Sequence, residues 1–360
     1  MQANAWREVS IQSLIYNYQS ILRFGGLPIC AVIKADAYGH GAQRLGHLYE
    51  ALGASMLAVA TLAEGVALRK NGIRIPILIL GFTPPCDAEI LEAYELTQTV
   101  GDPNHIEGLN NAVKGGVLSV HLKIDTGMSR YGIGHTAFDM LDLVAKCANL
   151  RLTGVYTHYA TADEGASDPL LRRALARFAP WRKEAHARFG DEVIVHDCNS
   201  ALLLSGLGQE LARVGILLYG YPPSATLAEK LPLIPAMTLK SRVVALHTLC
   251  AGESVGYGCA YTAKSRKRIA TISIGYADGL PRAASGYSVY IRGIPCPILG
   301  NICMDACMVD VTHLATIEVG EVVTIFGGEA NGANLLARQA ESIPYEILAR
   351  IGTRAPLHYC

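Results

Sequence analysis

Two patterns of hydrophobic and polar positions alternate through the first two thirds of the chain. Short apolar or β-branched runs recur, and longer segments between them carry apolar residues every three or four positions. A continuous apolar run is typical of a parallel strand buried on both faces, and the longer spacing is typical of a crossover helix. The strands predicted in this way are residues 29–33, 56–60, 77–80, 97–100, 117–124, 153–156, 193–196 and 211–214.

Helical spacing fills the gaps between these runs. The predicted helices are an amphipathic opening at 11–24 and segments 41–52, 61–71, 86–93, 136–148 and 169–189. Such alternation over about 200 residues favours an α/β fold with a closed (β/α)8 TIM-type barrel over an open doubly wound sheet. No G-x-G-x-x-G motif follows any of the runs, which argues against a dinucleotide-binding fold.

The pattern of hydrophobic and polar positions changes near residues 222–235, where four prolines mark a linker. Beyond it, short β-type runs separated by glycines dominate, at 241–249, 268–274, 287–291, 296–299, 307–311 and 321–326. We therefore predict a barrel domain over residues 1–231 and a smaller β-dominated domain over residues 232–360.

Composition and charge narrow the class of protein. The 360 residues are 51% hydrophobic and 17% charged, which is typical of a compact enzyme. Basic and acidic residues balance at 31 each, so no net field favours nucleic acid or an anionic membrane, and a small molecule is the expected partner. Ten scattered cysteines without a CxxC pair, no visible signal peptide and no apolar run long enough for a membrane span predict a cytoplasmic protein.

Lys34 is the residue whose position most needs a chemical explanation. It directly follows the apolar run 29–33, inside the stretch AVIKADAYGHGA, and so lies at the carboxyl end of a predicted buried strand. A desolvated ammonium there has a lowered pKa and can act as an amine nucleophile that forms a Schiff base. The alternative is a lysine that only extends from the strand end into water.

Other predicted strands also end in groups that can do chemistry, and catalytic groups of parallel barrels gather at that face. These groups are Lys123, Arg130, His158, His196, Asn199, Ser200, Arg213, Gly215 and Ile216. Asn199 and Ser200 begin an apolar helix, so they form either an ordinary cap or, with the amides near Gly215, a phosphate site. His158 is a metal ligand, a buried core histidine or a ring against a flat cofactor, but no spacing supplies a tetrahedral zinc set.

Two tyrosines of the second domain are flanked by small residues. Tyr257 lies between glycines, and Tyr276 lies in the sequence GYADG. Such surroundings leave a phenol projecting, which suits a proton donor or a substrate contact, whereas a buried structural tyrosine is the alternative. The loop containing Met304 and Asp305 is either a turn or a surface that meets a ligand.

Together these stretches resemble the alanine racemase family over essentially the whole chain. The motifs are AVIKADAYGHGA, KIDTGMSRYGIG, YTHYATADE, DCNSA, ARVGILLYG, GYGCAYT, SIGYADGLPR and GNICMDACMVD, in the expected order. The resemblance implies an isomerase that uses pyridoxal 5′-phosphate to interconvert L- and D-alanine and so supplies D-alanine for peptidoglycan. It also implies a homodimer with active sites shared across the interface.

The resemblance further assigns roles to individual residues. Lys34 binds the cofactor as a Schiff base and serves as the base for the D-enantiomer, while Tyr257 of the other subunit serves the L-enantiomer. Arg213 contacts the pyridine nitrogen with support from His158, and the other cofactor contacts are Tyr38, Asn199, Ser200, Gly215 and Ile216. The substrate contacts are Arg130, Tyr276, Met304 and Asp305, and Lys123 is the lysine that is often carbamylated in the family.

One position departs from the family pattern. Thr353 stands where well-known members carry tyrosine, and serine racemases similar to this family carry a smaller polar residue there. A serine racemase, or an enzyme for both amino acids, is therefore the alternative, including the soluble portion of a membrane-anchored serine racemase. A barrel-only pyridoxal-phosphate carrier is disfavoured by the second domain. An ornithine-type decarboxylase is disfavoured by Arg213, because such enzymes carry a carboxylate at the pyridine nitrogen.

Overall fold

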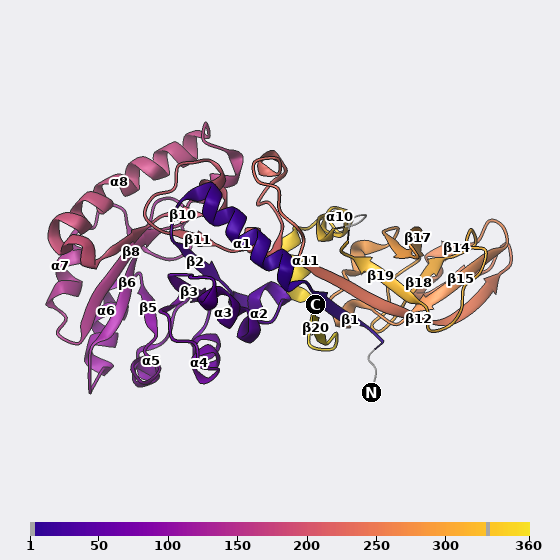
Figure 1. The fold of residues 1–360 in the computed structure, drawn as a ribbon, viewed down its shortest axis with the longest axis horizontal. Helices are drawn as coiled ribbons and strands as arrows, with labels where there is room; N and C mark the ends of the chain where they lie inside the picture. Colours follow the sequence, from indigo (N-terminus) through magenta and orange to yellow (C-terminus); the bar gives the residue numbers. More distant parts are fainter. Residues whose placement is uncertain (1–3, 329–331) are drawn as a thin grey trace. The chain divides into compact units, whose positions relative to one another are not determined.

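The computed structural model describes residues 4–328 and 332–360 and divides the chain into two units. One unit comprises Ile15–Ala37 and Gly41–Leu233, and we call it the barrel unit. The other comprises Met1–Leu14, Tyr38–His40 and Ile234–Cys360, and we call it the C-terminal unit. Figure 1 traces both units along the chain.

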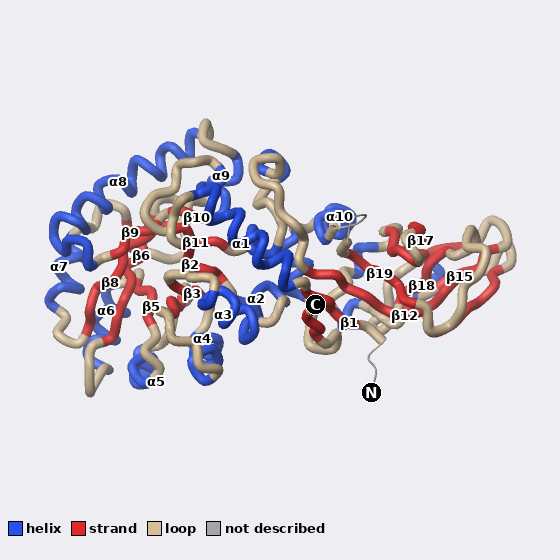
Figure 2. The backbone as a smooth tube through the Cα atoms, in the orientation of Figure 1, coloured by secondary structure: helices blue, strands red, loops and turns tan. Residues whose placement is uncertain are grey.

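The barrel unit is built on a ring of parallel strands (Figure 2). Its neighbours in order are β10, β11, β2, β3, β4, β5, β6, β8 and β9. Their bounds are β2 Ile29–Val32, β3 Met56–Val59, β4 Ile77–Ile79, β5 Thr97–Val100, β6 Leu118–Asp125, β8 Leu150–Thr157, β9 Ile194–His196, β10 Cys198–Asn199 and β11 Ala212–Val214. Only Asp197 separates β9 from β10, so the two form one interrupted strand, and the ring within the described residues closes with eight strands. The expected barrel is confirmed.

Helices connect the strands of this ring. They are α1 Ile11–Gly25, α2 Lys34–Gly39, α3 Ala42–Ala51, α4 Leu62–Lys70, α5 Ala88–Ala93, α6 Pro103–Ala112, α7 Asp139–Lys146, α8 Pro169–Phe189 and α9 Ser200–Leu204. Local signals explain several starts: Thr61 and Glu64 form a capping box on α4, and Asp102 and Asp168 cap α6 and α8, each followed by proline. No helix of the described residues is long and apolar enough to cross a membrane.

The C-terminal unit contains an antiparallel sheet that also closes on itself. Strands β15, β18, β17, β16, β19 and β12 are neighbours in that order, and β12 pairs again with β15. Their bounds are β12 Met237–Leu249, β15 Lys267–Ile272, β16 Ser288–Ile291, β17 Ile294–Leu299, β18 Cys307–Asp310 and β19 Val322–Phe326. The small pair β13 Ser254–Val255 and β14 Tyr261–Thr262 and the helices α10 Ala333–Gln339 and α11 Pro344–Arg350 complete this part. The second, β-rich part of the predicted fold is thus confirmed.

The structure departs from the predicted arrangement at the start of the chain. β1 (Trp6–Val9) pairs with β12 and with β20 (Leu357–Tyr359), which places the first residues in the C-terminal unit and not in the barrel. Residues 38–40 join the same unit because the Gly39 carbonyl accepts a hydrogen bond from Arg7 at 2.6 Å. The hydroxyl of Tyr359 likewise donates to the His40 carbonyl at 3.0 Å. Helices α6, α10 and α11 were not predicted from the sequence.

Candidate active site

Lys34 begins α2, and one residue, Ile33, separates it from the end of β2. The four residues after it, Ala35–Tyr38, have φ between 52 and 54°, so α2 is a single left-handed turn. Its beginning is held by the Glu64 carboxylate, which accepts from the Ala35 N–H at 2.6 Å. Burial lowers the pKa of Lys34, and the charge of Arg130 lowers it further, against an opposing effect of Glu64. The amine is therefore easier to deprotonate than a surface lysine.

The end of β6 supplies two more cations. Burial and the charges of Arg130 and Arg213 lower the pKa of Lys123 to about 8. The loop that leads to Arg130 is shaped by Asp125, whose carboxylate accepts hydrogen bonds from the backbone N–H groups of residues 127, 128 and 129 at 2.8–3.1 Å. Lys34, Lys123 and Arg130 thus interact electrostatically at the carboxyl ends of two barrel strands.

Arg213 on β11 is buried and tightly held. Its Nη1 donates to the His196 carbonyl at 2.7 Å and to His196 Nδ1 at 3.0 Å, and its Nη2 donates to the Thr157 carbonyl at 2.6 Å. The Nη2 group also lies 3.5 Å from His158 Nδ1. Its guanidinium stacks over the Tyr156 ring, 5.0 Å from the ring centroid. Within the described residues Nε–H has no protein acceptor, so it is the donor left for a ligand.

Arginine can only donate hydrogen bonds, and this fixes the protonation of the histidines behind it. His196 must accept at Nδ1, so its proton lies on Nε2, which lies 2.9 Å from His121 Nδ1 and donates to it. Burial and the Arg213 charge lower the pKa of His121 to about 3 and lower that of His196 as well. Both rings are therefore neutral and keep Arg213 in place. Burial also lowers the pKa of His158 to about 3, with Arg213 as the next cause.

The predicted phosphate residues meet at the ends of β10 and β11. The Asn199 side chain caps α9 by accepting from the N–H groups of Ala201 and Leu202 at 3.1 and 2.9 Å. The Ser200 hydroxyl accepts from the Gly215 N–H at 3.1 Å, and Ile216 is buried beside it in sequence at the start of a 3-10 turn. Ser200 and Gly215 are thus adjacent, while the Asn199 side chain serves the backbone of its own helix.

Tyr38 belongs to the C-terminal unit although it lies only four positions after Lys34. It is buried, its ring lies 6.0 Å from that of Tyr345, and burial raises the pKa of its phenol.

The remaining predicted residues occupy the C-terminal unit with exposed side chains. Tyr257 lies in the 3-10 turn Tyr257–Cys259 and is 73% exposed, whereas Tyr276 and Met304 are about half exposed, at 43% and 52%. Backbone hydrogen bonds join the Tyr276 turn to the Met304 loop, with Tyr276 N–H donating to the Cys303 carbonyl at 3.0 Å. Thr353 is exposed as well.

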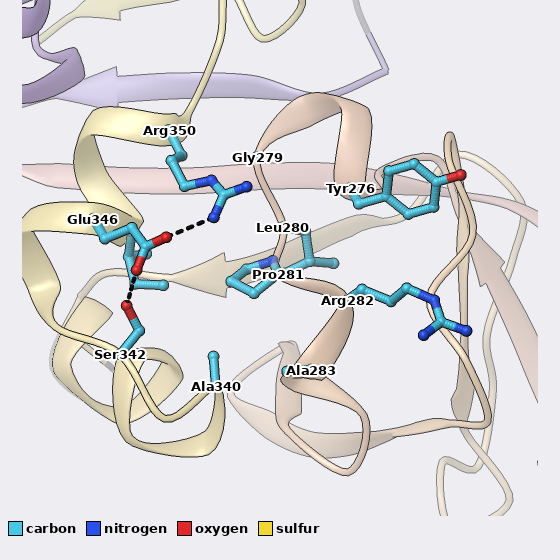
Figure 3. Close-up of a pocket in the computed structure, with 11 residues that line it drawn as sticks. Tyr276, Gly279, Leu280, Pro281, Arg282, Ala283, Ala340, Ser342, Glu346 and Arg350 are labelled. Atoms are coloured by element: carbon cyan, nitrogen blue, oxygen red, sulfur yellow. Dashed lines mark hydrogen bonds and ion pairs between the residues drawn. The ribbon is translucent and has the colours of Figure 1, made fainter.

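A pocket of about 440 Å³ lies next to Tyr276 in the same unit (Figure 3). Tyr276 and Arg282 lie on one side of it, and a chain of hydrogen bonds through Ser342, Glu346 and Arg350 lies on the other. Tyr276 therefore borders a hollow large enough for a small molecule.

Several residues of these clusters were not predicted from the sequence. His121 and Tyr156 lie inside the barrel strands β6 and β8, where periodicity indicates only buried positions. For His196 the sequence predicted a position at a strand end but no role in the site. Asp278 and Arg354 in the C-terminal unit were also missed, since an isolated charged residue carries no signal without its partner.

Comparison with known families decides how these clusters are interpreted. Residues 9–223 match the model of the alanine racemase N-terminal domain, and residues 236–359 match that of the alanine racemase C-terminal domain. The chain belongs to the alanine racemase family. Membership of this isomerase family, suggested by the sequence motifs, is confirmed. An alanine racemase of Desulfovibrio desulfuricans is 38% identical over 98% of this chain and 97% of its own length.

Solved structures of alanine racemases agree with the chain over its full length. The enzyme of Clostridium difficile 630 superposes with a TM-score of 0.93 at 35% identity, covering 100% of this chain and 96% of that one. The enzyme of Bacillus anthracis with bound L-Ala-P gives a TM-score of 0.93 at 31% identity, with the same coverage of both chains.

Proposed function

We propose that this protein interconverts L- and D-alanine with pyridoxal 5′-phosphate as cofactor and a lysine and a tyrosine as the two bases. The observation that carries the proposal is the cluster of Lys34, Lys123, Arg130 and Arg213 in the barrel unit. Burial lowers the pKa values of both lysines, and the charge of Arg130 lowers both further. Such a cluster suits a ligand that brings several negative charges, as a phosphate ester together with an amino-acid carboxylate does.

The residues present fit the cofactor. Arg213 keeps only its Nε–H uncommitted, which suits a neutral pyridine nitrogen because that nitrogen accepts a hydrogen bond. An arginine does not give up its proton, so it holds the nitrogen unprotonated. Ser200 and the amide of Ile216 would hold the phosphate, with help from Tyr38, beside Gly215, whose N–H donates to the Ser200 hydroxyl. Asn199 shapes the helix start. When bound, the cofactor withdraws electrons through a conjugated imine and so acidifies the Cα–H of the amino acid.

Racemisation requires one proton-transfer group on each face of Cα. We assign Lys34 to the D-enantiomer, as the resemblance to the family implies, and its lowered pKa makes the neutral, proton-accepting amine easier to form. We assign the phenol of Tyr257 to the L-enantiomer. One of the two groups removes the Cα proton from its own face, and the other donates the proton that it carries to the opposite face; the roles are exchanged in the reverse direction.

The exposure of Tyr257 supports a homodimer. A catalytic phenol that stays 73% exposed in the single chain would transfer protons to bulk water unless another molecule covered it. We therefore propose that the Tyr257 of a second copy completes each site, with Tyr276, Met304 and Asp305 contributing substrate contacts. Arg130 would bind the substrate carboxylate, and a carbamate on Lys123 would orient Arg130.

We propose a cytoplasmic enzyme that supplies D-alanine for peptidoglycan. All ten cysteines lie in the described part of the chain as free thiols, which agrees with a reducing compartment.

The deciding experiment is racemisation of L-alanine and L-serine side by side with the purified holoenzyme, reading kcat/KM for each. A kcat/KM for alanine on the order of 100-fold higher than that for serine, which is the discrimination that a small pocket achieves, supports an alanine racemase. Comparable rates would assign a serine-accepting enzyme, and no racemisation of either would refute the proposal. The control variant Lys34→Ala lacks the base, so it must abolish the measured rate.

A further inference from the structure

Three segments of the C-terminal unit meet through their main chains. They are the turn Gly275–Gly279, the loop 303–305 and the chain that follows α11 at 350–354. The N–H groups of Tyr276 and Ala277 donate to the carbonyls of Cys303 and Met304, both at 3.0 Å. A Cβ placed on Gly275 would lie 2.3 Å from the same two carbonyl oxygens. The turn and the loop therefore touch backbone to backbone, with no room for a side chain between them.

The third segment closes on the same turn. Gly279 has a φ of +104°, and a Cβ there would lie 2.5 Å from the Arg350 carbonyl oxygen. Any residue with a side chain would force the two backbones apart and would also be strained at this φ. The end of α11 thus rests directly on the turn that carries Tyr276.

Asp278 and Arg354 join the three segments by charge. The Asp278 carboxylate is buried, and its Oδ2 accepts from the Gly275 N–H at 2.9 Å. Its Oδ1 lies 3.2 Å from Arg354 Nε, and Arg354 Nη2 donates to Asp305 Oδ1 at 2.6 Å. Arg354 therefore bridges a buried carboxylate of the turn to the exposed carboxylate beside Met304.

The shape of the guanidinium matters for this bridge. Two different nitrogens of one rigid plane address two carboxylates on separate segments, whereas a lysine offers a single nitrogen. Asp278 is the fixed point, because a buried carboxylate that loses its cation is strongly destabilised. Arg354 thus adds a side-chain link to the backbone contacts between the Met304 loop and the turn.

We propose that Asp278 and Arg354 are positioning residues that set the substrate-binding loop of Met304 and Asp305 against Tyr276. The inference rests on the proposed function for the role of that loop in holding the substrate. Neither residue transfers a proton. A displaced loop weakens the substrate contacts in the ground state and in the transition state alike, so the effect falls on KM more than on kcat.

The test compares Arg354→Lys and Asp278→Asn with Arg292→Lys as the matched control. Arg292 belongs to the same unit, lies outside the pocket beside Tyr276, and forms an ion pair with Glu321 through a side chain that is 52% exposed, against 51% for Arg354. In the holoenzyme, Arg354→Lys should raise KM for both alanine enantiomers on the order of tenfold to 100-fold, since misplacement of a contact by about 1 Å has effects of this size. Its kcat and the visible absorbance of the cofactor should change little, and Arg292→Lys should behave as wild type.

Two further readouts separate positioning from general damage. Combining Asp278→Asn with Arg354→Lys should raise KM no more than the larger single effect, because both changes break one bridge. The Arg354 side chain is half exposed, so guanidinium from solution can reach the space that it leaves in Arg354→Ala. Guanidinium added at millimolar concentration should therefore partly restore the KM of this variant. An additive double variant, or a kcat loss with unchanged KM, would overturn the proposal.

Hydrogen exchange makes the test independent of activity. The amides of Tyr276 and Ala277, which donate to the Met304 loop, should exchange faster in Arg354→Lys than in Arg292→Lys. Equal exchange in the two variants would refute the bridge even if the enzyme is active. Failure of the wild type to racemise alanine, with faster exchange in Arg354→Lys, would instead refute the proposed function and leave the bridge established.

Discussion

Replacing Ala35 by glycine should stabilise the protein, although glycine usually weakens a helix. Ala35 has a φ of 52° in the left-handed turn α2, where the Cβ of an L-residue approaches the following carbonyl oxygen. This conformation costs about 1–2 kcal/mol per residue, and glycine avoids the cost. Against this gain, the greater freedom of glycine in the unfolded chain costs about 0.5–1 kcal/mol. The expected result lies between no change and about 1.5 kcal/mol of added stability.

The structure makes Ala35 a clean position for this test. Its side chain is exposed, so no packing is lost, and its N–H, which Glu64 accepts at 2.6 Å, is retained in glycine. Ala37 has a similar φ of 54° but is fully buried, so its replacement would mix the backbone effect with a cavity.

The matched control is Ala176→Gly in α8, where the side chain is also exposed and the helix is right-handed, although Pro180 cannot donate to the Ala176 carbonyl. Glycine there should cost about 1 kcal/mol. The assay is urea unfolding of the holoenzyme at one protein and cofactor concentration, because ligand and assembly both shift the midpoint. The two variants should move the midpoint in opposite directions. A loss for Ala35→Gly equal to that of Ala176→Gly would show that the turn after Lys34 is not left-handed.

Three further predictions concern single positions. Carbamylation of Lys123 needs the neutral amine, and a pKa lowered to about 8 makes that form available. The NMR signal of a carbamate formed from ¹³C-bicarbonate should therefore rise with pH through about 8 and be absent in Lys123→Arg. Absence of the signal from the wild type at pH 9 would refute the carbamylation. Thr353→Tyr should lower the serine-to-alanine ratio of kcat/KM by roughly tenfold or more, since tyrosine takes the space of a hydroxymethyl group, and an unchanged ratio would remove Thr353 from specificity. Gly154→Ala would place a Cβ 2.6 Å from the His121 ring and should cost about 1–3 kcal/mol in urea unfolding, with partial recovery when His121→Ala is added.

Strand existence and order in the barrel could be predicted because buried parallel strands have their own signature. The run at 97–100 coincides with β5, and the predicted helix 169–189 coincides with α8. These elements are specified locally, by continuous apolar residues in one case and by a proline-led, amphipathic pattern in the other. The left-handed turn α2 could not be predicted in the same way. Its four residues before Gly39 all carry side chains, so only contacts from elsewhere, such as that of Glu64, hold them at positive φ.

In the candidate site, too, some residues could be predicted from the sequence and others could not. Lys34, Lys123 and Arg213 could be predicted as chemical groups because a charged residue within or next to an apolar run contradicts the local pattern and so needs a chemical reason. The family motifs extended this to Tyr257 and Met304. The sequence by itself thus determined the fold class, the family and the residues proposed to do the chemistry.

Only the tertiary structure decided which residues hold those groups in place. His121 and His196 are 75 positions apart, and Asp278 and Arg354 are also distant in the chain, so no spacing links them. The protonation of the two histidines follows from a donor on a third strand, and the Arg354 bridge follows from backbones that approach too closely for a side chain. These relations depend on distances between strands and loops, which close packing sets and a linear pattern does not encode.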